Sequence, residues 1–436
     1  MIWNPKAECM SREEIEALQL VRLKETVQQV YEKNAHYRAK MEAIGLKPQD
    51  IQSLKDLAKM PFTVKDDLRQ TYPWGMLAVD KSEVVRLHGS SGTTGKPIFV
   101  AYTKKDLDTW SELLARIISA AGVGKEDTAQ VAFNYGLFTG GFGLHYGLEK
   151  VGAAVVPMSG GNTQKQLMLM QDLGTTALIA TPSYALHIAE VAEQMGIDMM
   201  KMPLKIGLFG GEPWSDEMRR EIEKRLCILA TDNYGLSEVM GPGVSGECYL
   251  ANGLHIAEDH FIVETINPET GEVLEPGQQG ELVFTSLTKE AFPIIRYRTR
   301  DISVIHQEPC PCGRTNARME RIIGRSDDML VIRGVNVFPS QIEAVILGFA
   351  ELGPQYQLHV YREGYLDTLE VKVELLDTTL LTSYGELEKL TKKIKNKIHS
   401  ILGLHCEVKL MEPASFERSA GKAKRVFDHR EGKVSF

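Results

Sequence analysis

The sequence lacks three features that would set it apart from ordinary globular proteins: long apolar runs, an excess of positive charge, and low-complexity segments. No stretch approaches about 18 consecutive apolar residues, so a membrane-spanning helix is not expected. The formal net charge of −8 argues against a nucleic-acid-binding surface, although it is compatible with a local basic pocket for phosphates. The N-terminal stretch carries acidic residues where a secretory signal would carry positive charge. We therefore expect a cytoplasmic protein without nucleic acid or membrane partners.

Cysteine is also scarce, with six residues in a chain of 436. They are too few and too widely spread for a disulfide scaffold, and a reducing compartment disfavours disulfides. The length exceeds the size at which one hydrophobic core usually stops growing, so two domains of unequal size are expected. The cysteines are Cys9, Cys227, Cys248, Cys310, Cys312 and Cys406.

The first two thirds of the chain predict helices alternating with strands. Ser11 stands three residues before Glu14, which is the spacing of a capping box at the start of a helix. Apolar residues then recur at helical spacing at Leu20, Leu23, Val27 and Val30. From residue 84 to about 236, short apolar runs alternate with amphipathic stretches. This alternation indicates βαβ units and a largely parallel sheet flanked by helices.

The pattern changes after residue 238. Strand-like runs joined by Pro-Glu-Thr-Gly and Pro-Gly turns predict an antiparallel hairpin and a β-rich subdomain. Beyond residue 324, mixed strand and helix patterns predict a small α+β domain. The predicted fold is therefore α/β, with a large N-terminal domain over residues 1–325 and a small C-terminal domain over residues 326–436.

The segment Ser90-Ser91-Gly92-Thr93-Thr94-Gly95-Lys96-Pro97 lies between two strand-like runs. Glycines let main-chain N–H groups approach an anion, hydroxyls add donors, and the lysine adds positive charge. The segment therefore suits phosphate binding, and a flexible serine-glycine turn is the alternative. It does not match the P-loop signature, because Ser90 stands at the first glycine position and Pro97 at the magnesium-binding hydroxyl.

Two further segments are candidates for a pocket that holds a planar acid. Residues 133–140 (FNYGLFTG) combine aromatic rings with glycine gaps, and residues 210–213 (GGEP) form a second glycine-rich turn. Such pockets are mostly apolar with few polar groups. For Phe133 and Leu137 the alternative is an ordinary place in the core.

Two cysteines separated by one residue, Cys310 and Cys312, predict a possible metal site. Cys248 and His255 could complete a Cys₃His tetrahedron of the structural zinc type, provided that the fold brings the pairs together. His260 is an alternative ligand, and plain turn cysteines are the alternative to any metal. A zinc ion held by four protein ligands would be structural, with no open position for catalysis.

Together with four later segments, the phosphate-binding candidate resembles the adenylate-forming superfamily of acyl-CoA synthetases. Residues 234–238 (YGLSE) resemble its Tyr-Gly-x-Ser/Thr-Glu motif, which implies that Tyr234 lies near adenine and that Glu238 is catalytic and lies near magnesium; a carboxylate is a suitable ligand for that ion. Residues 297–301 (YRTRD) resemble the motif whose aspartate, here Asp301, binds the ribose hydroxyls. Arg300 stands where the wider superfamily has glycine.

Two more segments of the resemblance concern the C-terminal domain. Residues 324–328 (GRSDD) resemble the interdomain hinge, which implies that Arg325 contacts the nucleotide and that Asp327 absorbs the rotation. Residues 418–425 (RSAGKAKR) resemble the C-terminal Gly-Lys motif, so Lys422 is the candidate catalytic lysine and Lys424 competes with it. A lysine suits the negative charge that develops when a carboxylate attacks phosphorus.

Longer strings such as FGGEPWS and TSLTKEAFPIIRYRTRD are similar to the phenylacetate-CoA ligases. The resemblance implies ATP-dependent activation of a small aryl acid through an acyl-adenylate, with magnesium, ATP/AMP and coenzyme A, in a homodimer with a mobile C-terminal domain. The implied acid pocket contains Tyr135, Phe138 and Gly140. The implied nucleotide-binding residues are Ser90, Ser91, Gly92, Thr93, Thr94, Gly95, Lys96, Gly211, Glu212, Pro213, Asp232, Asn233, Tyr234, Gly235, Asp301 and Arg325. A non-CoA acceptor and a non-catalytic nucleotide-binding regulator are the alternatives.

Overall fold

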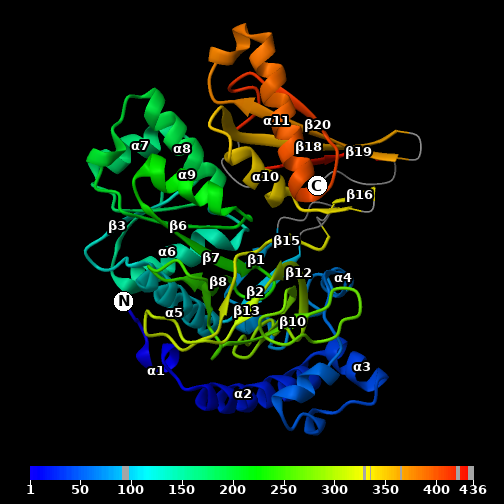
Figure 1. Ribbon diagram of the computed structural model, residues 1–436. Coiled ribbons are helices and arrows are strands. Elements are labelled where there is room, and N and C mark those ends of the chain that lie inside the picture. Colours follow the sequence, from blue (N-terminus) through cyan, green and yellow to red (C-terminus); the bar gives the residue numbers. More distant parts are fainter. Residues whose placement is uncertain (91–97, 328–329, 334, 364–365, 419–422, 431–436) are drawn as a thin grey trace. The chain divides into compact units, whose positions relative to one another are not determined.

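The structure is a computed structural model that describes residues 1–90, 98–327, 330–333, 335–363, 366–418 and 423–430 (Figure 1). The chain forms two compact units that do not follow chain order. The first unit comprises residues 1–180, 200–211 and 228–321, and the second comprises residues 181–199, 212–227 and 322–436.

The N-terminal helices begin as the sequence predicts. Ser11 accepts a hydrogen bond from the Glu14 backbone, and the Glu14 side chain accepts one from the Ser11 backbone, so the predicted capping box is present. Leu23, Val27 and Val30 of this helix are completely buried. The helices of this region are α1 (Pro5–Glu8), α2 (Arg12–Lys33), α3 (Ala35–Ala43) and α4 (Lys65–Gln70).

A nine-stranded sheet in the order β13-β14-β9-β8-β7-β6-β5-β3-β4 forms the centre of the first unit. Its strands β4, β3, β5, β6 and β7 pair in parallel, which confirms the predicted βαβ organisation. The sheet then continues in antiparallel fashion through β8 and β9. The strands are β3 (Thr128–Val131), β4 (Ala154–Val156), β5 (Ala177–Ala180), β6 (Ile206–Gly210), β7 (Leu229–Leu236), β8 (Gly241–Glu247), β9 (Leu254–Ile256), β13 (Ile305–His306) and β14 (Arg318–Met319).

Helices α5 (Lys104–Ala121) and α6 (Thr139–Val151) pack against each other and against β8 (Figure 1). Helix α7 (Thr163–Asp172) follows β4 in the chain. Within the described parts of the chain, no helix is both long enough and apolar enough to span a lipid bilayer.

The first two predicted strands do not join the parallel sheet. β1 (Arg86–Gly89) and β2 (Phe99–Tyr102) form a separate antiparallel pair. The physical reason is the length of the connection: nine residues separate these strands, whereas a parallel crossover needs a dozen or more.

The predicted β-rich subdomain contains the antiparallel strands β10 (Phe261–Ile266), β11 (Gly280–Ser286) and β12 (Tyr297–Ser303). The Pro-Glu-Thr-Gly turn lies in the connection between β10 and β11. Gly271 adopts a left-handed backbone there, with φ of 76°, which glycine tolerates without steric cost.

The second unit contains a four-stranded sheet in the order β20-β19-β18-β21. Apolar residues of β18, β19, α10 and α11 form its core, which confirms the predicted α+β character of the C-terminal region. Helices α8 and α9, from the middle of the chain, also belong to this unit. Its elements are α8 (Pro182–Gln194), α9 (Asp216–Leu226), β15 (Gly324–Arg325), β16 (Leu330–Ile332), β17 (Val335–Val337), α10 (Pro339–Leu347), β18 (Leu352–Glu363), β19 (Leu366–Leu375), α11 (Tyr384–Leu402), β20 (Glu407–Met411) and β21 (Val426–Asp428).

Candidate functional site

Predicted site residues gather at the carboxyl ends of the parallel strands. Gly211 directly follows β6, and residues 232–235 form the end of the neighbouring strand β7, where Gly210 is paired with Asn233. Tyr135 follows β3 by four residues. Ligands of open parallel sheets bind at this edge, so the sheet topology brings the predicted nucleotide and acid segments to a common place.

Tyr234 and Asp301 come from different sheets and meet directly. The Tyr234 hydroxyl donates a hydrogen bond of 2.6 Å to Asp301 Oδ2. The Tyr234 ring stacks on Phe284 of β11, with the ring centroids 5.9 Å apart. Asp301 is largely buried, and Asp232 and Asn233 beside Tyr234 are buried as well. Two of the predicted motifs are thus joined by a single contact.

Close backbone approach explains two glycines of this segment. A Cβ atom at Gly235 would lie 1.9 Å from the carbonyl oxygen of Gly241. A Cβ at Gly210 would lie 2.2 Å from the carbonyl oxygen of Asn233. No side chain fits at either position unless the backbone moves.

Glu238 follows β7 in a turn and is largely buried, with 6% of its surface exposed. Within the described residues, its carboxylate makes no hydrogen bond or ion pair. Buried carboxylates are normally paired or coordinate a metal. The unpaired carboxylate therefore suits a hard cation such as Mg²⁺.

Arg300 adopts the left-handed conformation for which the superfamily motif uses glycine, with φ of 69°. Glu281, which is completely buried, holds this turn. Its carboxylate accepts hydrogen bonds from the Arg300 backbone at 3.3 Å and from the Arg298 side chain at 2.6 and 3.0 Å. The turn that presents Asp301 is thus preserved although the glycine is replaced.

The predicted phosphate loop is described only at its base. The backbone N–H of Ser90 donates to the carbonyl of Ile98 at 2.9 Å, and that of Gly89 donates to Leu137 at 2.8 Å. The base of the loop therefore lies against the acid-pocket segment. The predicted phosphate-binding residues Ser91, Gly92, Thr93, Thr94, Gly95 and Lys96 lie outside the described residues.

Tyr135 and Phe138 of the predicted acid pocket are both half-buried. The Tyr135 hydroxyl lies 3.1 Å from His145 Nδ1, and His145 Nε2 lies 3.1 Å from Glu149. Burial raises the pKa of Tyr135, and the neighbouring Glu149 adds to this effect. A Cβ at the buried Gly140 would lie 2.6 Å from the Phe138 ring, so this glycine makes room for the ring.

An ordinary place in the core, the alternative for Phe133 and Leu137, is confirmed for one of these two residues. Phe133 is buried in the core, whereas Leu137 is 55% exposed. The structure also adds a contact between the segments: Thr139 Oγ1 lies 3.2 Å from Ser237 Oγ, and both residues are buried. No sequence motif of residues 139 and 237 indicated this contact, because the two positions meet only in the folded chain.

The remaining predicted site residues belong to the second unit. Arg325 and Asp327 form a two-pronged ion pair with two contacts of 2.9 Å. Glu212 accepts hydrogen bonds from the backbone of Ser183 at 2.7 Å and of Ala423 at 3.2 Å. Its carboxylate therefore binds the backbone of the predicted lysine motif at Ala423.

Pro213 is exposed. Lys422 lies outside the described residues, and its competitor Lys424 has its ammonium 5.0 Å from the Phe427 ring centroid.

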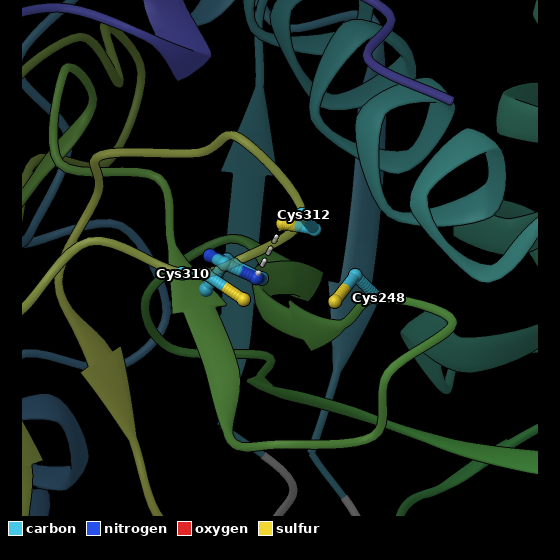
Figure 2. Close-up of side chains that lie close together, drawn as sticks. Cys248, Cys310 and Cys312 are labelled. Atoms are coloured by element: carbon cyan, nitrogen blue, oxygen red, sulfur yellow. Dashed lines mark hydrogen bonds between the residues drawn. The ribbon is translucent and has the colours of Figure 1, made fainter.

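All four predicted metal ligands lie together in the first unit. Cys248 follows β8, His255 lies in β9, and Cys310 and Cys312 lie in the loop before β14. One ligand atom from each residue lies within 4.8 Å of every other. Figure 2 shows the three sulfur atoms pointing toward a common centre. His260 does not join them, because it lies 2.7 Å from Thr288 and 3.1 Å from Asp259.

The surroundings of the cluster favour the thiolate form of Cys312 but not that of Cys248. Burial acts to raise the pKa of Cys312, but hydrogen bonds with His255 and Arg314 lower it to about 5. Burial raises the pKa of Cys248 to about 12 in the absence of a metal. Three sulfurs and one imidazole nitrogen within 4.8 Å of one another match the donor set of structural zinc sites.

Family models match both ends of the chain. The model for AMP-binding enzymes matches residues 14–288, and that for the C-terminal domain of AMP-binding enzymes matches residues 334–430. The protein is therefore an AMP-binding enzyme of the adenylate-forming superfamily, with the fold that its sequence predicts.

Individual relatives narrow this class. The chain is 52% identical to the phenylacetate-coenzyme A ligase of Aromatoleum evansii over 96% of each chain. It is 50% identical to the phenylacetate-coenzyme A ligase of Escherichia coli (strain K12) over 99% of each chain. The chain belongs to the phenylacetate-coenzyme A ligase family.

A solved structure agrees at the level of the fold. 2-Hydroxyisobutyryl-CoA ligase in the postadenylation state, in complex with R3-HIB-AMP, matches with a TM-score of 0.93 and 28% identity. The match covers 98% of this chain and 92% of that chain.

Proposed function

We propose that this protein is an ATP-dependent ligase that activates a small aryl carboxylic acid, of the phenylacetate kind, as an acyl-adenylate and transfers it to coenzyme A. The observation that carries the proposal is the hydrogen bond between Tyr234 and Asp301, together with the buried Glu238 shortly after Tyr234, whose carboxylate has no partner among the described residues. The family membership supports the same reaction.

In the first step, a carboxylate oxygen of the acid attacks the α-phosphorus of ATP and the bond to pyrophosphate breaks. Asp301 would accept hydrogen bonds from the ribose hydroxyls, and Tyr234 would line the adenine site. The loop of residues 90–96 would donate backbone and hydroxyl hydrogen bonds to the phosphates. Lys422 would stabilise the negative charge that develops on the α-phosphate.

In the second step, the CoA thiol loses its proton and attacks the acyl carbon, a C–S bond forms, and AMP leaves. We propose that the C-terminal domain, residues 326–436, rotates about Asp327 between the steps. The rotation would withdraw Lys422 and admit the thiol. Breaking the exposed pair between Arg325 and Asp327 would cost about 1 kcal/mol or less, which is compatible with a hinge.

The donor set also fits magnesium. Glu238 would hold the ion, and the bound ion would supply positive charge that neutralises the phosphates. The supporting observation is that this largely buried carboxylate makes no contact with another charged group in the described part of the chain.

The acid would lie beside Tyr135, Phe138 and Gly140. A panel of phenylacetate, hydroxylated phenylacetate, indoleacetate and benzoate, assayed for AMP formation with and without CoA, tests the proposal. We expect CoA-dependent AMP release with at least one aryl acid. AMP release that needs another acceptor would indicate a different ligase. Thermal stabilisation by ATP without turnover of any acid would indicate a non-catalytic regulator.

We also propose that Cys248, His255, Cys310 and Cys312 bind one structural zinc ion. The support is the proximity of their ligand atoms and the identity of the four donors. The ion would have no open position for a substrate, so its effect would be on stability.

The family resemblance supports a homodimer, which light scattering of the purified protein would test. A cytoplasmic location would agree with the need for reduced thiols at the proposed zinc site. Equal zinc content with and without reductant during purification would contradict the need for reduction.

A further inference from the structure

A buried lysine lies near the segment that carries Glu238 and has no role in the steps described above. Lys289 follows β11, and its side chain is one of the largest fully buried side chains among the residues that the structure describes. Among the residues that the structure describes, its ammonium nitrogen has no hydrogen-bond partner. Burying an ammonium group without a hydrogen-bonded anion costs free energy of folding, so this lysine does not serve stability.

Aromatic rings take the place of hydrogen-bond acceptors around this ammonium. Lys289 Nζ lies 4.4 Å from the ring centroid of Tyr102 and 5.7 Å from that of Phe292. A cation over an aromatic face is attracted by the ring quadrupole, and the attraction is stronger when water is excluded. The ring contacts therefore orient the ammonium but offset only part of the cost of burial.

Tyr102 connects the lysine to the segment of Glu238. Its hydroxyl donates a hydrogen bond of 2.9 Å to the carbonyl of Met240, two residues beyond Glu238. The Tyr102 ring also stacks on Trp110, whose indole N–H donates to the carbonyl of Pro242 at 2.6 Å. Two stacked rings thus hold the backbone that follows Glu238, and Lys289 lies over one of them.

The backbone around Lys289 is fixed by Asp106. This fully buried carboxylate accepts hydrogen bonds from the backbone of Glu290 at 2.7 Å and of Ala291 at 3.0 Å. Burial lowers the pKa of Lys289 to about 8, and the charges of Asp106 and Glu238 oppose this shift. The lysine is therefore an electrostatic neighbour of both carboxylates.

We propose that Lys289 is a positioning residue for Glu238. Its ammonium, held against the Tyr102 ring, fixes that ring and so keeps the segment after Glu238 in the conformation that receives the cation of Mg-ATP. This inference rests on the proposed role of Glu238 in magnesium binding.

Lys289→Met and Lys289→Gln test the proposal through stability and metal dependence. We expect Lys289→Met to raise the midpoint of thermal unfolding of the free protein, because an apolar group of similar length replaces an unpaired buried charge. We expect the half-saturating Mg²⁺ concentration for adenylation to rise about tenfold in both variants, because residues that position a metal ligand typically have effects of this size. The thermal stabilisation by Mg-ATP should shrink in parallel.

Lys105→Met is the matched control, because its exposed ammonium pairs with the neighbouring Glu290 at 2.6 Å. Lys105→Met should leave the unfolding midpoint, the half-saturating Mg²⁺ concentration and the thermal stabilisation by Mg-ATP close to their wild-type values. A lower unfolding midpoint in Lys289→Met with an unchanged Mg²⁺ requirement would show that the lysine only packs, and would overturn the proposal.

Glu238→Gln separates the two ways of failing. If that variant leaves the Mg²⁺ requirement unchanged, the proposed magnesium role of Glu238 is wrong. If Glu238→Gln raises the requirement while the Lys289 variants do not, only the positioning role of Lys289 is wrong.

Discussion

At the scale of single residues, the hydrogen bond from Tyr234 to Asp301 gives a direct test of the nucleotide site. Tyr234→Phe removes the hydroxyl and keeps the ring that stacks on Phe284. A hydrogen bond to a charged group contributes about 1.5–3 kcal/mol. Without it, Asp301 is oriented less well, so ATP binding loses part of this free energy. We expect the KM for ATP to rise about 2- to 10-fold with kcat much less affected, measured by steady-state kinetics.

Tyr31→Phe is a suitable control, because its hydroxyl makes a single long, exposed contact of 3.4 Å with Glu42. Its kinetics should match those of the wild type. An unchanged KM for ATP in Tyr234→Phe would contradict the assignment of Asp301 to the ribose.

Lys289 also predicts a pH dependence of stability. Burial lowers the pKa of the Lys289 ammonium to about 8 in the folded chain, although the charges of Asp106 and Glu238 act to raise it. The other titratable groups near this ammonium are His88 and Tyr102. Between pH 8 and about 10.5 the unfolded chain binds more protons at this site, so the free energy of unfolding rises with pH. Below pH 8 the ammonium is charged in both the folded and the unfolded chain, so the full cost of burying its charge lowers the free energy of unfolding.

The stability difference between Lys289→Met and the wild type should therefore narrow as the pH rises from 7 to 9.5. Thermal or denaturant unfolding of both proteins across this range measures it. A difference that stays constant would mean that the ammonium does not lose its proton in the folded protein.

Much of the candidate site could be predicted from single residues. The residue types of the motifs indicate the groups that they can bind, as with the carboxylates of Glu238 and Asp301. The burial of Lys289 was not readable, because a lysine between threonine and glutamate has the polarity of an exposed loop. Its environment comes from Tyr102, which is almost 190 residues away in sequence.

At the scale of elements, the loop before β14 connects the proposed zinc site to the N-terminal segment. Arg314, two residues after Cys312, pairs with Glu8 at 2.6 Å, and both side chains are almost completely buried. The backbone of Thr315 also donates to the carbonyl of Glu8 at 3.1 Å. A metal that fixes this loop would therefore also fix α1.

We expect the purified protein to contain one zinc ion per chain, measured by elemental analysis. Cys312→Ala should release the ion and lower the unfolding midpoint by several degrees. Without the metal, the loop that carries Arg314 would hold its buried pair with Glu8 less firmly, so we also expect α1 to loosen. In limited proteolysis, the Cys312→Ala variant should then be cleaved between α1 and α2 faster than the wild type.

Cys227→Ser is the control for this experiment, since Cys227 is exposed and lies outside the cluster. It should keep both the zinc and the stability. A purified wild type that contains no zinc, or one whose unfolding midpoint stays the same after a chelator removes the zinc, would contradict the zinc proposal.

The elements themselves were only partly predictable. The capping box of α2 and the βαβ pattern are local, and the structure confirms them. The separation of β1 and β2 from the main sheet depends on connection length, and the meeting of Cys248 with Cys310 depends on the pairing of β9 with β14. Pairing between distant strands is not encoded in the periodicity of either one.

At the scale of the whole molecule, the proposed reaction needs both units, and the two half-reactions depend on them differently. Lys422→Ala should abolish acid-dependent ATP–pyrophosphate exchange, because the lysine would stabilise charge only in the first step. Thiolation of a preformed aryl-adenylate should survive in the same variant. Measuring both half-reactions separately distinguishes this loss from general unfolding.

Lys424→Ala is the comparison, because Lys424 is the competing candidate for the same role. It should retain pyrophosphate exchange. Full exchange activity in Lys422→Ala together with its loss in Lys424→Ala would transfer the catalytic role to Lys424.

The turn at Arg300 has a consequence for how related sequences vary. A left-handed backbone at a residue with a side chain costs about 1–2 kcal/mol, and glycine would remove this cost. Arg300 in return places a second guanidinium 3.5 Å from the buried Glu281, besides Arg298. Positions 281, 298 and 300 should therefore covary: homologues with glycine at 300 should still keep the acid at 281 wherever they keep Arg298, and should lose it only where both arginines are replaced.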